Sequence, residues 1–458
     1  MAPCRRGHRA NRAHGTHGGT ARVLVPGIVC LVMAFGQSCG QTSRPSTPVE
    51  DRLAAVAGQG GFSGPLKVFQ VDRSQRYSIG GAQRFVGAGF QPSVVFDQEG
   101  AIHVFFQARL DGSGDRAEKL IAHVVSRDAG RTFSAVHFVN PVPMQTYAVS
   151  AFSRLLPSGK ERISVLTSLS IDETVSRLKD PAVIKERLGI DVTAVSRQAA
   201  TLILEFYSDD GGQNWTRKDH PHVADRLYKR NGREYYLAFI NLIGQVRRIE
   251  AGPYAGRLIL GGPLRGDYLP CKDYPHFRNY HSSSSLVYSD DGGESWCFGG
   301  VIGDSTAFKH NEGSAIPVNG GRRILLARRS TAPNAPGKTM HYSNDGGATW
   351  EPGFVTTVSA TRCLQVLESH GDLVLCSAPG RKNRTNGRIY FSHDAGKTWS
   401  YRMIEEGPFS YSTVNRLTGP YLICCYSQGH HGEQGVTARV FSVDWLLRQD
   451  DGTKPGRE

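Results

Sequence analysis

Short runs in which apolar and polar residues alternate occur along most of the chain, separated by turns rich in glycine and aspartate. Residues 90–96 (FQPSVVF) lead into a turn with the sequence DQEG, and the chain returns as residues 101–109 (AIHVFFQAR). A period of two places successive side chains on opposite faces of a strand, so this pair predicts an antiparallel hairpin. The plan recurs throughout the chain and predicts an all-β fold.

One nine-residue phrase occurs five times and marks the tightest of these turns. Its clearest copy is YSDDGGESW at residues 288–296. The other copies are YSDDGGQNW at 207–215, YSNDGGATW at 342–350, FSHDAGKTW at 391–399 and, more loosely, VSRDAGRTF at 125–133. The aspartate can accept hydrogen bonds from the turn's own amides, and glycine can adopt positive φ. Each copy therefore predicts a strand, a tight turn and a second strand, with a structural role for its acidic residues.

The intervals between the copies predict the number of repeating units. The serines of the phrase are Ser126, Ser208, Ser289, Ser343 and Ser392, which gives intervals of 82, 81, 54 and 49 residues. A spacing near fifty suits a four-stranded propeller blade. Residues 170–198 carry charges and helix formers and predict a helical excursion. We predict a six-bladed β-propeller with repeated hairpins, closed where an N-terminal strand meets residues 435–445 (GVTARVFSVDW).

Charge and composition divide the chain and restrict its partners. The 458 residues carry a formal net charge of +13, but six arginines precede the first acidic residue, Glu50. The remaining charge is scattered, without a basic stripe interleaved with aromatic residues, so we expect no nucleic-acid partner. We expect a signal peptide or leader over residues 1–45, a linker over 46–75, the propeller over 76–450 and a tail over 451–458.

The leader predicts export. A basic start leads into the apolar residues 23–35 (VLVPGIVCLVMAF), which are too few to span a bilayer and suit a signal peptide. The mature protein would be secreted or, if Cys39 is processed as a lipoprotein cysteine, anchored by a lipid at the cell surface. The six cysteines beyond the leader form no metal-type CxxC pair, so they predict buried thiols or one or two disulfides.

Several motifs stand in a fixed order around the repeats. They are QPSVVF, VFFQAR, the loop LDGSGDRAEK, NE at 311–312, LLARRS at 325–330, Arg384 eight residues before the last repeat serine, and GPFSYST at 407–413. This succession resembles the sialidases (neuraminidases) of the six-bladed propeller type, whose repeated hairpin is the Asp-box. The resemblance covers roughly residues 85–430 and implies a glycoside hydrolase that requires no metal or cofactor.

The resemblance implies three catalytic residues. Tyr411 matches the tyrosine nucleophile of the sialidases, and Glu312 matches its partner base. A phenol suits a substrate whose anomeric carbon carries a carboxylate, because it attacks without bringing a second negative charge close. The acid/base is expected on the loop after Arg109. Its distance from Arg109 favours Asp115, while Asp111 stays open and is the better fit to an ordinary turn.

The resemblance also implies arginines that hold the substrate carboxylate, because a planar guanidinium pairs with both oxygens. Arg384 matches one of three such arginines, and either Arg328 or Arg329 matches another. Arg109 resembles a further family arginine near the site. The remaining carboxylate-binding arginine lies just ahead of a proline in the first strand of sialidases, but this chain has no arginine before Pro92. Arg84 or Arg109 would have to replace it.

We therefore predict an exported exo-glycoside hydrolase that removes terminal sialic acid or a related acidic sugar with retention. Its partners would be sialylated or other acidic glycans and glycoconjugates. One alternative is a propeller that binds carbohydrate as an adhesion module without turnover. Another is a different activity on the same fold, a hydrolase or lyase for uronate-containing glycans. The presence of Tyr411, Glu312 and Arg384 favours the enzyme, whereas Gln91 in the region of the missing arginine favours altered use.

Overall fold

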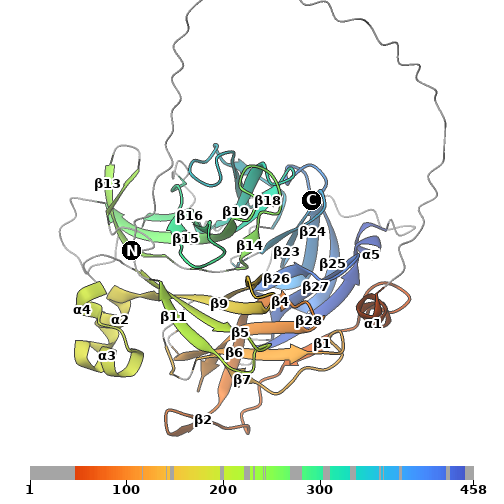
Figure 1. Ribbon diagram of the computed structural model, residues 1–458. Coiled ribbons are helices and arrows are strands. Elements are labelled where there is room, and N and C mark those ends of the chain that lie inside the picture. The colour runs from red at the N-terminus through yellow and green to blue at the C-terminus, as the bar shows by residue number, and fades with distance from the viewer. Residues whose placement is uncertain are drawn as a thin grey trace, which may run out of the picture. The chain divides into compact units, whose positions relative to one another are not determined.

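The computed structural model forms a β-propeller of six antiparallel sheets, or blades, around a common axis (Figure 1). It describes residues 47–448 except 116, 141, 145–148, 196–200, 221–226, 231, 232, 241, 243, 269–280, 303–309, 331–336, 360–362, 365, 381–383 and 430–433. The predicted all-β, six-bladed fold is confirmed. Within these residues, no helix has the length and apolar character to cross a membrane.

The blades follow one another along the chain. Blade 1 contains β4 (Val86–Phe96), β5 (Ile102–Leu110), β6 (Lys119–Ser126) and β7 (His137–Phe138). Blade 2 contains β8 (Ser150–Leu155), β9 (Glu161–Ser170), β10 (Thr201–Ser208) and β11 (Thr216–His220). Blade 3 contains β12 (Leu227–Arg230), β13 (Arg233–Ile240), β14 (Arg247–Arg248), β15 (Leu258–Tyr268), β16 (His281–Ser289) and β17 (Cys297–Phe298).

The second half of the ring repeats this plan. Blade 4 contains β18 (His310–Val318), β19 (Arg323–Ser330), β20 (Thr339–Ser343) and β21 (Phe354–Val355). Blade 5 contains β22 (Leu367–His370), β23 (Leu373–Ala378), β24 (Thr385–Ser392) and β25 (Ser400–Pro408). Blade 6 contains β26 (Ser412–Arg416), β27 (Tyr421–Gln428), β28 (Gly435–Ser442) and, from the other end of the chain, β1 (Leu66–Phe69).

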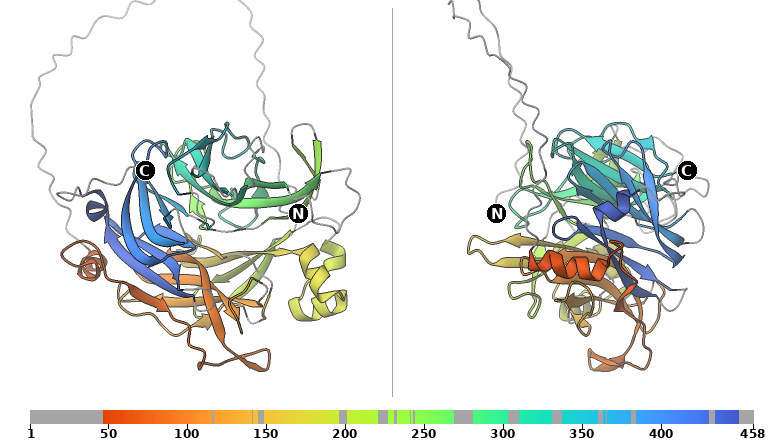
Figure 2. Two further views of the ribbon diagram at one scale, coloured as in Figure 1. Left: turned by 180° about the vertical axis from the view of Figure 1, so that it is seen from behind. Right: turned by 90° about the vertical axis from the view of Figure 1, so that its right-hand side faces the viewer.

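The ring is closed by pairing of β1 with β28, in which Leu66 lies opposite Ala438. This is the closure expected from residues 435–445, and α5 (Val443–Leu447) follows it. The N-terminal side differs from the expected linker over residues 46–75. It forms α1 (Pro48–Ala57), which packs beside blade 6 through the buried Leu53, and then β1 (Figure 2). Without β1, the edge of β28 would lack a partner, which explains why this segment joins the fold.

Two smaller features lie outside the blades. A short hairpin of β2 (Tyr77–Ile79) and β3 (Ala82–Arg84) precedes blade 1. The expected helical excursion lies between β9 and β10 and consists of α2 (Ile171–Leu178), α3 (Pro181–Leu188) and α4 (Val192–Val195). Asp180 caps α3 through its bond to the amide of Ala182, and Gly189 ends this helix in the left-handed conformation.

The Asp-box hairpins join the last two strands of each of blades 1 to 5, and the aspartate shared by the five copies bonds within each turn. In blade 2, the Ser208 hydroxyl donates to Asp210 (2.7 Å), and the Gly212 amide donates to Ser208 (2.9 Å). The amide of Asn214 donates to Asp210, and such bonds lower the pKa of Asp210 to about 2. The predicted structural role of these aspartates is confirmed, because their oxygens are occupied by the turn itself.

Two buried histidines give the fold a predictable response to acid. His123, in blade 1, bonds to His103 (3.0 Å) and stacks on Phe105. Burial first, and then the neighbouring His103, lowers the pKa of His123 to about 3. Burial and Arg328 lower the pKa of His341 to about 4. Both histidines are therefore neutral in the folded protein at pH values where they are charged in the unfolded chain.

We expect the free energy of unfolding to decrease as the pH falls below 6.5, the pKa of an unfolded histidine. As the pH falls, each histidine takes up its proton in the unfolded chain at a higher pH than in the folded protein. Between these two pKa values, each histidine lowers the free energy of unfolding by about 1.4 kcal/mol per pH unit. Urea unfolding at pH 7, 6 and 5 measures this slope. A His123→Phe variant should show a smaller slope than wild type, and an unchanged slope would contradict the assignment.

Candidate active site

Tyr411 and Glu312 meet from two different blades. Tyr411 immediately precedes β26 in blade 6, and Glu312 is the third residue of β18 in blade 4. The Tyr411 hydroxyl donates a hydrogen bond of 2.8 Å to Glu312 Oε1, and both residues are buried. A phenol bonded to a carboxylate inside the protein is the arrangement that allows a base to take the proton of an attacking oxygen.

The backbone is strained at three positions of this region. Gln91, Glu312 and Arg384 have φ values of 53°, 38° and 52°, which residues other than glycine rarely adopt. Irregular register places a bulge in β4 between Phe90 and Ser93, and another in β18 around Glu312. Bulges redirect side chains relative to a regular strand, and strain of this kind concentrates at functional sites.

Aromatic and cationic groups surround the Tyr411 ring. The Phe90 ring lies 4.4 Å from the Tyr411 ring, centre to centre, in a cluster of buried residues that includes Cys363. The Arg384 guanidinium carbon lies 5.3 Å from the centre of the Tyr411 ring, and that of Arg109 lies 4.2 Å from the centre of the Phe90 ring. Packing on these sides holds the Tyr411 hydroxyl in place beside Glu312.

Arg109 bonds to the loop that follows it. Its Nε donates to Gln107 (2.9 Å), one terminal nitrogen donates to the Ser113 carbonyl (2.5 Å), and the other pairs with Asp115 (2.9 Å). Burial lowers the pKa of Arg109, whereas Asp115 and Tyr411 act to raise it. The expected contact between Arg109 and a substrate carboxylate would therefore compete with three protein groups, and in this structure Arg109 positions the loop.

The two candidate acid residues occupy different surroundings. The Asp115 side chain is 95% exposed and pairs with Arg109, which connects it to the Tyr411 region. Asp111 instead accepts bonds from Arg84 (2.6 Å) and from the amide of Phe85 (3.2 Å). Arg84 also pairs with Glu118 (2.6 Å). Asp111 and Arg84 thus hold the base of the loop, which gives no support to Arg84 as a substitute for the missing arginine.

The other predicted arginines differ in position. Arg384 adjoins the Tyr–Glu pair, and one of its terminal nitrogens lies 3.5 Å from the Ser410 hydroxyl. Arg328 is 1% exposed and bonds to Ser284 (3.1 Å) and His341 (3.2 Å) on neighbouring strands. Arg329 belongs to β19 opposite Asn311, but its side chain lies outside the described residues. The choice between Arg328 and Arg329 stays open.

Comparisons with known proteins show what this chain is similar to. Residues 236–424 match the model of the BNR repeat-like domain, and residues 206–217 match the BNR/Asp-box repeat. A sialidase from Micromonospora viridifaciens is 25% identical over 253 residues, which are 52% of this chain and 35% of that protein. A sialidase from Paraclostridium sordellii is 30% identical over 162 residues, which are 32% of this chain and 40% of that protein. The chain therefore spans less than half the length of either relative.

Solved structures agree at the level of the fold. The intramolecular trans-sialidase from Ruminococcus gnavus, solved in complex with oseltamivir carboxylate, is 16% identical to this chain. The two superpose with a TM-score of 0.56, covering 80% of this chain and 97% of the other. The chain is therefore similar to the sialidases in its Asp-box repeats and in part of its sequence, and it shares their six-bladed propeller fold.

The motifs of the sialidase superfamily did not reveal two residues of this site. Phe90 packs against Tyr411, and Gln107 orients Arg109. The period of two in β5 places Gln107 and Arg109 on one face of the strand. The sequence pattern could therefore have indicated that Gln107 contacts Arg109. Phe90 carried no such signal, because an aromatic residue in a strand is ordinarily a core residue.

Asp115 is expected to matter most when the leaving group is poor. An alkyl or sugar leaving group requires a proton, whereas nitrophenolate departs without one. Asp115→Asn should therefore lower kcat roughly 100-fold on a sialyl-oligosaccharide, with a much smaller effect on a nitrophenyl sialoside. Steady-state kinetics on both substrates measures the difference. Asp111→Asn is the matched control, and equal losses on the two substrates would contradict an acid role for Asp115.

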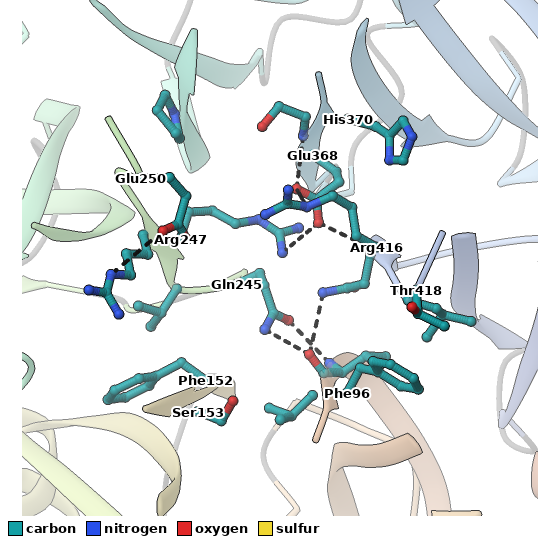
Figure 3. A pocket seen from close by; sticks show the side chains of 18 of the residues that line it. Phe96, Phe152, Ser153, Gln245, Arg247, Glu250, Glu368, His370, Arg416 and Thr418 are labelled. Atoms are coloured by element: carbon teal, nitrogen blue, oxygen red, sulfur yellow. Dashed lines mark hydrogen bonds and ion pairs between the residues drawn. The ribbon is translucent and has the colours of Figure 1, made fainter. Parts of the chain in front are cut away.

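The opposite end of the propeller carries a different set of polar residues. A cavity of about 490 Å³ lies at the carboxyl ends of β4, β22 and β26 (Figure 3). Tyr411 lies before the amino end of β26, so the two regions are separated by about 16 Å along that strand. The chemistry suggested by Tyr411 and Glu312 therefore belongs to one end of the axis.

Residues from five blades close the axis at this second end. Gln245 bonds to Ser93 (2.7 Å), to the backbone of Val94 and to the Ala151 carbonyl. Arg247 pairs with Glu368 (2.9 Å), which also accepts the Arg416 amide (3.1 Å). Figure 3 shows Arg247, Glu368 and Arg416 converging near Gln245. These bonds connect blades 1, 2, 3, 5 and 6 and indicate a structural role.

Proposed function

We propose that this chain is an exo-glycoside hydrolase that cleaves a terminal acidic sugar, sialic acid in the first place, with retention at the anomeric carbon. The observation that carries the proposal is the 2.8 Å bond from the Tyr411 hydroxyl to Glu312 inside the propeller. The partial sequence similarity to two proteins named sialidase adds support. Their low identity leaves the substrate of this chain as part of the proposal.

The proposed first step forms a glycosyl–tyrosine bond. Tyr411 Oη attacks the anomeric carbon as its proton passes to Glu312, and the bond to the leaving oxygen breaks. Asp115, on the loop held by Arg109, supplies the proton that the leaving oxygen takes up. To do so, Asp115 must be protonated and must leave its ion pair with Arg109, so the step requires the loop to move.

The proposed second step reverses the first with water in place of the alcohol. Asp115 accepts a proton from the water as the water attacks the anomeric carbon, and Glu312 returns its proton to the departing Tyr411 oxygen. Two displacements at one carbon give net retention. Arg384, beside the Tyr411 ring, is positioned to attract the substrate carboxylate.

Export is a second part of the proposal. It rests on the basic and apolar leader together with the state of the cysteines. Cys297 is disulfide-bonded, and disulfides persist mainly in oxidising compartments. Cys363, Cys376, Cys424 and Cys425 are buried thiols outside any disulfide. Cell fractionation of the full chain, with a Cys39→Ser variant, tests secretion against lipid anchoring.

The test of function is hydrolysis of a fluorogenic α-sialoside across acidic to neutral pH, with NMR detection of the first sugar anomer released. Retention predicts that the α anomer of free sialic acid appears first and then equilibrates. Initial release of the β anomer would overturn the mechanism. Binding of sialyllactose without turnover would instead indicate the adhesion module, and turnover of a uronate glycoside alone would indicate the other activity.

A further inference from the structure

We propose that Gln91 determines which sugar the site prefers, by accepting a hydrogen bond from a hydroxyl or N–H group of the substrate. The inference rests on the proposed function, because it refines the substrate of the same site. It starts from a departure in this chain, where no arginine precedes Pro92 and the residue next to that proline is a neutral amide, Gln91.

Gln91 is held in an unusual state. It lies in the bulge of β4 with a φ of 53°, and 9% of the residue is exposed. Its buried side-chain carbonyl oxygen has no hydrogen-bond partner among the described residues. A buried acceptor without a donor is unfavourable, so a strained residue with such an atom indicates a ligand rather than a packing role.

The bulge is fixed from both sides, and Gln91 directly follows the residue that contacts the Tyr–Glu pair. On one side, Phe90 packs against Tyr411. On the other, the Ser93 hydroxyl donates to Gln245 (2.7 Å) and accepts the Ala151 amide (2.9 Å). Because its flanking residues are held by neighbouring blades, Gln91 cannot relax into a regular strand without breaking these contacts.

The chemistry of an amide sets the preference. A carboxylate carries acceptors only, so its oxygens are not complementary to the Gln91 carbonyl oxygen, whereas a hydroxyl or amide N–H is. An amide also supplies no positive charge. Arg109 is directed to the loop in this structure, where its three nitrogens bond to Gln107, Ser113 and Asp115. The site should therefore favour a carboxylate less than an arginine-lined site would, and should favour a donor at the position of Gln91.

Binding of two matched sugars tests this inference. The probes are N-acetylneuraminic acid and its C1 carboxamide, which replaces the carboxylate with a group that carries N–H donors. Calorimetry on the wild-type protein should show that the carboxamide binds at least as tightly as the acid. Gln91→Leu should weaken carboxamide binding by about tenfold or more, with little change for the acid. Gln91→Arg should strengthen acid binding by a similar factor and reverse the preference.

A variant of the same shape covers the case in which Gln91→Leu or Gln91→Arg does not fold. Gln91→Glu keeps the acceptor and adds a negative charge, so it should retain carboxamide binding and weaken acid binding at least tenfold. Wild-type preference for the acid by 100-fold or more would overturn the inference, as would binding constants that no Gln91 variant changes. Failure of the wild type to bind either probe would overturn it as well.

These outcomes separate the inference from the proposed function. The calorimetric comparison requires no turnover, so a Gln91-dependent preference in a protein that hydrolyses nothing would contradict the hydrolase alone. Turnover of the sialoside at a rate and KM that Gln91 variants leave unchanged would contradict the specificity role alone.

Discussion

Tyr411→Phe is expected to abolish hydrolysis, with kcat lowered roughly 1,000-fold or more. The substitution removes only the hydroxyl that donates to Glu312, and it keeps the ring that packs between Phe90 and Arg384. No nucleophile then remains at that position, whereas substrate contacts from the arginines are kept. The loss should therefore appear in kcat while binding of free sialic acid stays within a few-fold of wild type.

The chain offers a matched control for this change. Tyr426, in β27 of the same blade, is also buried and also donates to a glutamate, Glu405 (2.7 Å). Tyr426→Phe deletes an equivalent hydroxyl away from the site and should lower stability by about 1 kcal/mol without a large change in kcat. Equal kinetic losses in Tyr411→Phe and Tyr426→Phe would show that the effect is structural. Glu312→Gln should lower kcat as Tyr411→Phe does, because the base is removed.

Glu368→Gln is expected to destabilise the folded propeller by about 3 kcal/mol or more. The Arg247 side chain is only 10% exposed and donates to the carbonyl oxygens of Leu367 and Val414. Glu368 is the carboxylate that balances its charge. Burial lowers the pKa of Arg247, and Glu368 acts in the opposite direction. Removing the negative charge leaves a guanidinium out of water without compensation. Urea or thermal unfolding measures the loss.

An exposed ion pair provides the comparison. Glu351 pairs with Arg323 at 2.6 Å, but its side chain is 42% exposed. Glu351→Gln should cost less than about 1 kcal/mol, because water solvates the remaining charge. Below its lowered unfolding temperature, Glu368→Gln should keep wild-type kcat, because the cavity and the Tyr–Glu pair lie at opposite ends of the inner strands. Equal destabilisation by the two variants would contradict the role assigned to the axial ion pair.

The periodic features of the fold could be predicted from the sequence. The Asp-box phrase predicted the hairpins, and its spacing predicted six blades, because each hairpin is a local structure encoded within nine residues. The helical excursion before Ser208 could also be predicted from its composition. The helix α1 and the strand β1 before residue 75 could not, because they are stabilised by blade 6, almost 400 residues away in the chain. Local composition contains no information about such a partner.

By itself, the sequence determined the repeat, the number of blades and the residue types available for chemistry, and it showed that the arginine before Pro92 is missing. Only the tertiary structure decided which of these residues meet. It brought Tyr411 to Glu312, which lies 99 positions away in the chain. It also paired Arg109 with Asp115 of the loop and Asp111 with Arg84. The Gln91 carbonyl oxygen became buried in a bulge. The physical reason is that periodicity is a local property, whereas hydrogen bonds between blades depend on ring closure and on strand irregularities that no short sequence window specifies.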